Sequence, residues 1–231
     1  MIIEIKNVSF TYNAGSPLSR KVLDGASLSI GKGEFVGIIG RTGSGKSTLV
    51  QHMNGLLKPD SGTVAVDGQD IWAKGASLTS VRRKVGLVFQ YPEHQLFDET
   101  VVGDISFGPR NMGLSEDEVK ERVMEAMDIV DLDYSSYKDR SPFELSGGQK
   151  RRAAIAGVLA MRPDVIVLDE PAAGMDPSGR DEILGEIDKM HKRGGFTVVL
   201  VSHSMEDVAK HADRLIVMDK GRVVLSGGPR E

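Results

Sequence analysis

Gly40-Arg41-Thr42-Gly43-Ser44-Gly45-Lys46-Ser47 matches the pattern G-x-x-x-x-G-K-[ST]. The apolar run from Phe35 to Ile39 precedes it and a helical pattern from Lys46 to Leu56 follows, which places the loop between a buried strand and a helix. Its glycines let successive backbone N–H groups turn inward, and the start of the helix adds a partial positive charge at the same place. The pattern therefore predicts a cradle for the phosphates of a nucleotide.

Two residues at the end of this loop have expected chemical roles. Lys46 is expected to bridge the β- and γ-phosphate oxygens, and the hydroxyl of Ser47 to ligate Mg²⁺. The alternative is a glycine-rich structural turn, which the strand–loop–helix context disfavours. The other residues expected to bind the nucleotide are Gly40, Arg41, Thr42, Gly43, Ser44, Gly45 and Thr48.

A pair of adjacent carboxylates follows the apolar strand pattern from Val165 to Leu168. Asp169 and Glu170 would lie at the carboxyl end of that strand, where α/β sheets bind their ligands. Asp169 is expected to hold Mg²⁺, and Glu170 to orient or deprotonate the attacking water. Taken alone, an Asp-Glu pair is as well explained by a polar turn after a strand, so this interpretation depends on the phosphate loop upstream.

A second glycine-rich segment, Leu145-Ser146-Gly147-Gly148-Gln149, opens a helical pattern that runs from about Gln149 to Met161. It combines a capping serine with exposed backbone donors at the start of a helix, the arrangement that binds anions. A capping serine followed by flexible glycines would also be an adequate structural explanation.

Apolar strand patterns alternate with helices through most of the chain, which favours a parallel sheet covered on both faces. The first 30 residues and a small hairpin, 63–66 with Ile71-Trp72, read as antiparallel strands. We therefore expect an α/β fold: a P-loop NTPase core with a mostly parallel sheet, an antiparallel β subdomain and an inserted α-helical subdomain. All of it forms one domain, residues 1–231, with the core at about 1–90 and 162–231 and the helical part at about 91–161.

Composition limits the possible functions. With 231 residues, 40% hydrophobic and 27% charged, the chain has the usage of a folded globular domain. The absence of cysteine excludes disulfides, thiolate zinc sites and cysteine nucleophiles. The net charge of −4 disfavours a nucleic-acid partner. No apolar run approaches the ~20 residues that cross a bilayer, and the N-terminus is not a secretory signal, so a membrane role would act through partners.

The chain resembles the ATP-binding-cassette ATPases in three motifs that occur in the same order: the phosphate loop, the Leu-Ser-Gly-Gly-Gln segment, and the apolar strand with Asp-Glu. The resemblance extends from Ile2 to Gly228. The pentad is the most specific part, because other P-loop classes lack it. The resemblance implies an ATPase that uses ATP and Mg²⁺. It also implies that two chains pack head to tail, so that Leu145, Ser146, Gly147, Gly148 and Gln149 of one chain cover the γ-phosphate held by the other.

The resemblance assigns roles to four further residues. It implies that Tyr12 stacks on adenine, that Gln90 senses Mg²⁺ and the attacking water, and that His203 contacts the γ-phosphate. Asp176 would be the central residue of the D-loop, Ala173 to Asp176. Without the resemblance, the first three would be interpreted as an ordinary strand tyrosine, a polar residue at the start of a loop and a structural histidine.

Two segments, 89–97 and 107–111, are similar to the ATPases of energy-coupling-factor transporters, which import vitamins or transition-metal ions. This implies three partners: a second ATPase subunit, identical or paralogous, a membrane coupling protein and a substrate-capturing membrane subunit. The chain would then be peripheral, on the cytoplasmic face of a prokaryotic cell membrane. The segment from Pro92 to Phe97 is the expected docking surface, and the alternative is an amphipathic loop packed within its own chain.

Two other functions compete with this one. The first is the ATPase of a conventional importer with a periplasmic binding protein, which the segment from Tyr91 to Phe97 disfavours. The second is a DNA-maintenance or ribosome-associated cassette ATPase. Long inserted coiled coils or two cassettes per chain are typical of those, and neither is present here. Transporter ATPases of the expected type usually have a C-terminal extension, whereas this sequence ends at Glu231, so we expect a clipped chain or a short member of the group.

Overall fold

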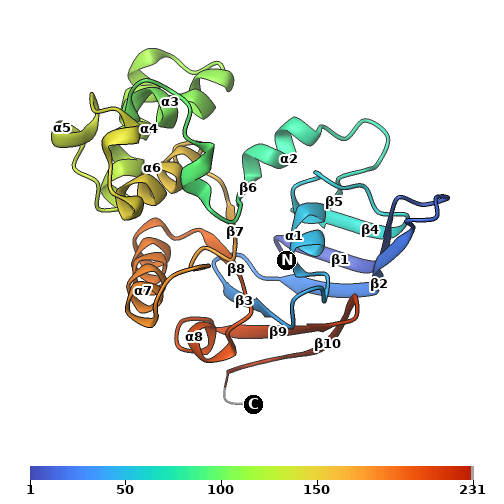
Figure 1. Ribbon diagram of the computed structural model, residues 1–231. Coiled ribbons are helices and arrows are strands. Elements are labelled where there is room, and N and C mark those ends of the chain that lie inside the picture. The colour runs from blue at the N-terminus through green and yellow to red at the C-terminus, as the bar shows by residue number, and fades with distance from the viewer. Residues whose placement is uncertain (230–231) are drawn as a thin grey trace.

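A six-stranded, mostly parallel sheet forms the centre of the computed structural model, which describes residues 1–229 except for the side chain of Asp207 (Figure 1). The order across the sheet is β10-β9-β3-β8-β7-β6, and β10 alone runs antiparallel to its neighbour among these strands. The strands are β3 (Phe35–Ile39), β6 (Val85–Val88), β7 (Val165–Asp169), β8 (Thr197–Ser202), β9 (Arg214–Asp219) and β10 (Arg222–Gly227).

An antiparallel sheet of order β2-β1-β4-β5 lies beside the central one. It contains β1 (Ile3–Tyr12), β2 (Arg20–Ile30), β4 (Ser61–Val66) and β5 (Gln69–Asp70). The expected hairpin is present, but the prediction of its second strand at Ile71-Trp72 was wrong. The two-residue turn at Asp67-Gly68 pairs Val66 directly with Gln69, and Asp70 accepts a hydrogen bond from the Trp72 amide (2.9 Å), which turns the chain away.

The helices fall into two groups. Four flank the sheets: α1 (Lys46–Met53), α2 (Leu78–Lys84), α7 (Pro177–Gly194) and α8 (Met205–Ala209). The others form a helical lobe on one side of the molecule, green to yellow in Figure 1: η1 (Pro92–Gln95), α3 (Val101–Asn111), α4 (Glu116–Ile129), α5 (Tyr134–Tyr137), η2 (Pro142–Glu144) and α6 (Gly147–Leu159). A capping box between Ser115 and Glu118 begins α4. The mixture of elements confirms the predicted α/β fold.

The central sheet is buried on both faces, because its side chains alternate between two apolar cores. On β3, Phe35 and Ile39 join a core shared with α7 and the helical lobe, while Val36 and Ile38 join a core shared with α1 and the antiparallel sheet. All five residues of β3 are therefore buried, which is why its sequence is continuously apolar.

His52 is a polar residue inside the second of these cores. The side chain is fully buried on α1; its Nδ1 lies 2.7 Å from the Thr48 carbonyl oxygen, to which it donates, and Phe10 packs edge-on against the ring at 5.0 Å. Within residues 1–229 the Nε2 atom has no hydrogen-bond partner. Burial lowers the pKa of His52, outweighing the opposing effect of the Thr48 carbonyl.

Exchange of His52 for asparagine is expected to make the fold less sensitive to acid. The folded chain resists protonation at His52 while the unfolded chain does not, so stability is lost as the pH falls from about 6.5 towards the lowered pKa of the folded state. An asparagine side chain would keep a donor for Thr48 but could not titrate. Denaturant unfolding at pH 7.5 and 5.5 should show a smaller decrease in His52→Asn, by on the order of 1 kcal/mol. An equal decrease in both proteins would contradict the prediction.

Candidate active site

The phosphate loop follows β3 and ends where α1 begins. Gly40 has φ 153°, and a Cβ at that position would lie 2.3 Å from the carbonyl oxygen of Met218. Gly45, with φ 102°, is the residue before α1 and has the left-handed conformation that other residues rarely adopt. These two glycines allow the backbone to turn tightly against β9 and then enter the helix, so the loop has the strand–loop–helix context that the sequence predicted.

Lys46 is buried beneath this loop, at 5% exposure. Its Nζ donates to the carbonyl oxygens of Gly40 (2.9 Å) and Arg41 (3.3 Å) and lies 3.8 Å from a carboxylate oxygen of Glu170. A buried ammonium held by main-chain oxygens at the start of a helix produces a concentrated positive charge. The arrangement is suited to an anion with several negative oxygens.

Asp169 and Ser47 form a pair of oxygen ligands beside the lysine. The Ser47 hydroxyl donates to Asp169 at 3.2 Å, and Asp169 is 6% exposed. Burial raises the pKa of Asp169, and neighbouring Glu170 adds to the effect. No cluster of three or more His, Cys, Asp or Glu side chains that could hold a metal occurs in residues 1–229. Mg²⁺ commonly binds through one or two carboxylates together with substrate phosphates, so the hydroxyl and carboxylate fit this ion.

The order of the parallel strands brings three further residues to the same edge. His203 follows β8, Glu170 follows β7 and Gln90 follows β6, and these strands are neighbours in the sheet. His203 Nδ1 lies 3.0 Å from a carboxylate oxygen of Glu170. Glu170 itself has φ 50°, an uncommon conformation for a residue other than glycine that often marks functional sites.

A cavity of about 520 Å³ connects these groups. Tyr12 lines this cavity and is 37% exposed, and its hydroxyl lies 3.4 Å from the Thr48 hydroxyl. The lining residues are Tyr12, Arg20, Val22, Thr42, Gly43, Gly45, Lys46, Ser47, Thr48, Gln90, Glu170 and His203. Sequence reasoning missed Arg20 and Val22. They begin a strand of ordinary alternation, and only the pairing of β2 with β1 places them beside Tyr12.

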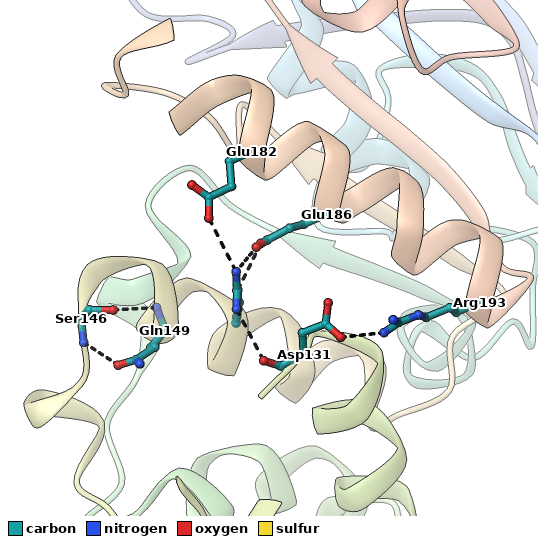
Figure 2. Close-up of polar contacts among 7 residues, drawn as sticks. Asp131, Ser146, Gln149, Glu182, Glu186 and Arg193 are labelled. Atoms are coloured by element: carbon teal, nitrogen blue, oxygen red, sulfur yellow. Dashed lines mark hydrogen bonds and ion pairs between the residues drawn. The ribbon is translucent and has the colours of Figure 1, made fainter. Parts of the chain in front are cut away.

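The Leu145–Gln149 segment and Asp176 do not line this cavity. Ser146 and Gln149 form a reciprocal capping box at the start of α6, with N···O distances of 3.3 and 3.0 Å (Figure 2). The helix begins at Gly147, two residues before the predicted start. Gly147 and Gly148 are exposed, and a Cβ at either position would meet nothing within 4 Å. These two residues are therefore accessible at the start of α6 and lie outside the nucleotide cavity of their own chain.

A family model described as ABC transporter matches residues 23–173. The chain belongs to the ABC transporter family. Two relatives are energy-coupling factor transporter ATP-binding proteins EcfA2. The one from Clostridium tetani is 58% identical over 231 residues, covering all of this chain and 80% of that protein. The one from Clostridium acetobutylicum is 60% identical over 227 residues, 98% of this chain and 79% of that protein. The predicted family resemblance is confirmed.

Solved structures agree with this assignment. CbiO1 from Clostridium perfringens, described as part of the ABC transporter complex CbiONQ, has a TM-score of 0.88 and 41% identity, covering 99% of this chain and 89% of its own. The ATP-binding cassette MJ0796, in a dimeric post-hydrolysis state with ADP and phosphate, has a TM-score of 0.82 and 31% identity, covering 99% of both chains. This chain is thus an ABC ATPase that binds ATP. None of the helices in residues 1–229 has the length and apolarity needed to cross a membrane.

Proposed function

We propose that this ABC ATPase is the energy-coupling subunit of an importer of the energy-coupling-factor type, which takes up vitamins or transition-metal ions. The observation that carries the proposal is the 52–60% identity to energy-coupling factor ATP-binding proteins, with each match spanning 98% or more of the chain. In this proposal the chain is peripheral and works at the cytoplasmic face of a prokaryotic cell membrane.

In the proposed reaction, the phosphate loop holds the triphosphate and Tyr12 stacks on adenine. Ser47, Asp169 and Gln90 would hold Mg²⁺, which when bound neutralises charge on the β- and γ-phosphates. Glu170 would orient or deprotonate the attacking water, and its contacts with Lys46 and His203 support this role. His203 contacts the γ-phosphate.

The same proposal requires a second ATPase subunit, identical or paralogous. Two chains would pack head to tail, with Ser146, Gly147 and Gly148 over the γ-phosphate of the other chain and Asp176 near the interface. The exposed glycines at the start of α6 support this, because the backbone N–H groups at a helix N-terminus can stabilise transferring charge.

A groove of about 450 Å³ between α2, α3 and α6 supports a partner that docks on the helical lobe. Phe97 and Phe107, 59% and 53% exposed, meet edge to face in it at 5.0 Å. Only the second half of the expected docking segment, Gln95 to Phe97, lines this groove. Pro92 is buried and Glu93 pairs with Arg151, so these two residues are packed within their own chain. We propose that the membrane coupling protein docks in this groove.

Capture of the tagged full chain from membranes of its native cells tests the proposed function. We expect three proteins to co-purify: a second ATPase, a membrane coupling protein and a small substrate-capturing membrane protein. Phe97→Asp is expected to reduce recovery of the membrane proteins at least about tenfold, because it buries a charge in an apolar interface, while ATP affinity is unchanged.

The matched control is Met124→Asp, which places the same charge on an exposed apolar residue of α4 outside the groove. Recovery unaffected by Phe97→Asp would exclude the groove as the docking surface. Capture with two permease subunits and a periplasmic binding protein would instead indicate a conventional importer.

A further inference from the structure

Arg151 is a buried arginine on α6 that lies outside the nucleotide cavity. Its exposure is 4%, and its guanidinium makes two contacts with the carboxylate of Glu93 in η1, Nε to Oε2 at 3.3 Å and Nη2 to Oε1 at 3.2 Å. The remaining guanidinium nitrogen, Nη1, lies 3.2 Å from the sulfur of Met175. One side chain therefore joins three segments that are far apart in sequence.

Met175 connects this guanidinium to the segment that follows β7. Its carbonyl oxygen accepts a hydrogen bond from Arg180 Nε at 3.2 Å, and the next residue, Asp176, caps α7 by accepting from the Gly179 amide at 2.7 Å. Tyr91, the residue just before η1, makes a second contact with the same segment. Its ring lies against Gly174, where an added Cβ would be 3.5 Å from the Tyr91 hydroxyl. Tyr91, the residue before η1, thus lies against Gly174, and Glu93 of η1 is joined to Met175 through Arg151.

The short helix η1 lies between two functional regions. On one side its last residue, Gln95, and the following Leu96 and Phe97 line the apolar groove of the helical lobe. On the other side Glu93 is held by Arg151, and Gln90 upstream lines the nucleotide cavity. A displacement of the groove wall would therefore move Glu93 and, with it, the guanidinium.

We propose that Arg151 is a positioning residue that couples the groove to the hydrolytic machinery, setting the position of the α6 start and of Met175-Asp176 according to where η1 lies. An arginine suits this role because its planar guanidinium pairs with a carboxylate through two N–H groups, which determines both the distance and the orientation of the carboxylate. Because both ions are largely desolvated, either one alone would be an uncompensated charge, so the pair moves as a unit. Only the identity of the docking partner rests on the proposed function.

The neighbouring Arg152 provides a matched comparison. Its Nε lies 3.2 Å from Glu186 and its Nη2 lies 3.9 Å from Glu182, two residues that project from α7 toward the lobe (Figure 2). Arg193 of α7 and Asp131 form another pair across the same junction, 2.8 Å apart. Arg152 thus holds α6 to α7 rather than to η1, so Glu186→Gln removes an arginine–carboxylate pair from the same helix without touching the proposed coupling.

The first test is amide hydrogen exchange on the full chain with Glu93→Gln. Ala173 and Met175 both donate backbone hydrogen bonds, to Glu170 and Ala172, so their exchange reports the order of this segment. We expect exchange at residues 172–176 to become several-fold faster in Glu93→Gln and to stay at the wild-type rate in Glu186→Gln. Faster exchange confined to η1 would overturn the proposal, and this readout requires no activity.

The second test is a double-mutant cycle on ATP hydrolysis. Glu93→Gln and Arg151→Met are each expected to lower kcat roughly tenfold with ATP binding nearly unchanged, and the double variant to be no slower than the slower single variant. Arg151→Lys should restore only part of kcat, because it keeps the charge but loses the planar guanidinium. If the decreases in kcat of the two single variants add up in the double variant, the proposal is overturned. It is also overturned if the single variants lower only the melting temperature. Failure of the proposed transporter function would appear instead as missing membrane partners, with both tests unaffected.

Discussion

Replacing Glu170 with glutamine is expected to lower ATP turnover by about a hundredfold or more, with ATP affinity within a few-fold of wild type. The amide has the shape of the carboxylate but cannot accept a proton from water. Glu170 lies 3.0 Å from His203 and 3.8 Å from Lys46, and the substitution leaves the phosphate loop unchanged. Phosphate release at saturating ATP measures the turnover, and equilibrium titration with ATP measures the affinity.

The control for this substitution is Glu182→Gln, the same change at an exposed position on α7, which should leave turnover near wild type. Unchanged turnover in Glu170→Gln would remove Glu170 from the proposed role. A large loss of ATP affinity would instead place its carboxylate among the groups that bind the nucleotide.

ATP is expected to convert the Glu170→Gln chain from monomer to dimer, and Gly148→Asp in the same chain is expected to weaken that dimer by about a hundredfold or more. In the proposed head-to-tail pair, Gly148 faces the γ-phosphate of the other chain, so a carboxylate there would oppose several negative oxygens at close range. The substitution is compatible with the folded monomer, because a Cβ at Gly148 meets nothing within 4 Å and an acidic residue suits the first turn of a helix. Sedimentation velocity with and without ATP measures the dimer.

Gly185→Asp is the matched control, since this glycine of α7 also has open space where a Cβ would lie. Monomer affinity for ATP, measured in the Gly148→Asp chain, should be unchanged because that residue does not line the cavity of its own chain. A double variant that dimerises normally would refute the shared site. A Glu170→Gln chain that stays monomeric at saturating ATP would exclude pairing between two identical copies and leave a paralogous partner.

Several parts of the site could be predicted because each is a contiguous segment with its own local rules. The phosphate loop needs its glycines at specified positions, and the start of α6 needs a capping serine, Ser146, directly before its glycines. The hairpin at Asp67-Gly68 was also predictable, although its second strand began earlier than expected. Such patterns depend on residues a few positions apart, so one sequence contains the needed information.

The docking segment shows where local patterns stop being sufficient. Residues 92–97 form one short 3₁₀ helix and two further residues, too few to display a period. Glu93 and Phe97 therefore look equally exposed in the sequence, yet Glu93 turns inward because Arg151 on α6 supplies a buried partner. Similarly, the run Lys150-Arg151-Arg152 reads as a solvated face, whereas Arg151 is 4% exposed in the fold.

The sequence by itself determined the phosphate loop, the two adjacent carboxylates at the end of β7, the capped start of α6 and, through their order along the chain, the family. Only the tertiary structure decided that Gln90, Glu170 and His203 share one edge with Lys46, that Arg20 and Val22 belong to the same cavity, and that Arg151 joins η1 to Met175. The reason is physical: backbone conformation within a segment depends on its own residues, whereas the order of strands and the facing of side chains depend on which distant surfaces bury each other.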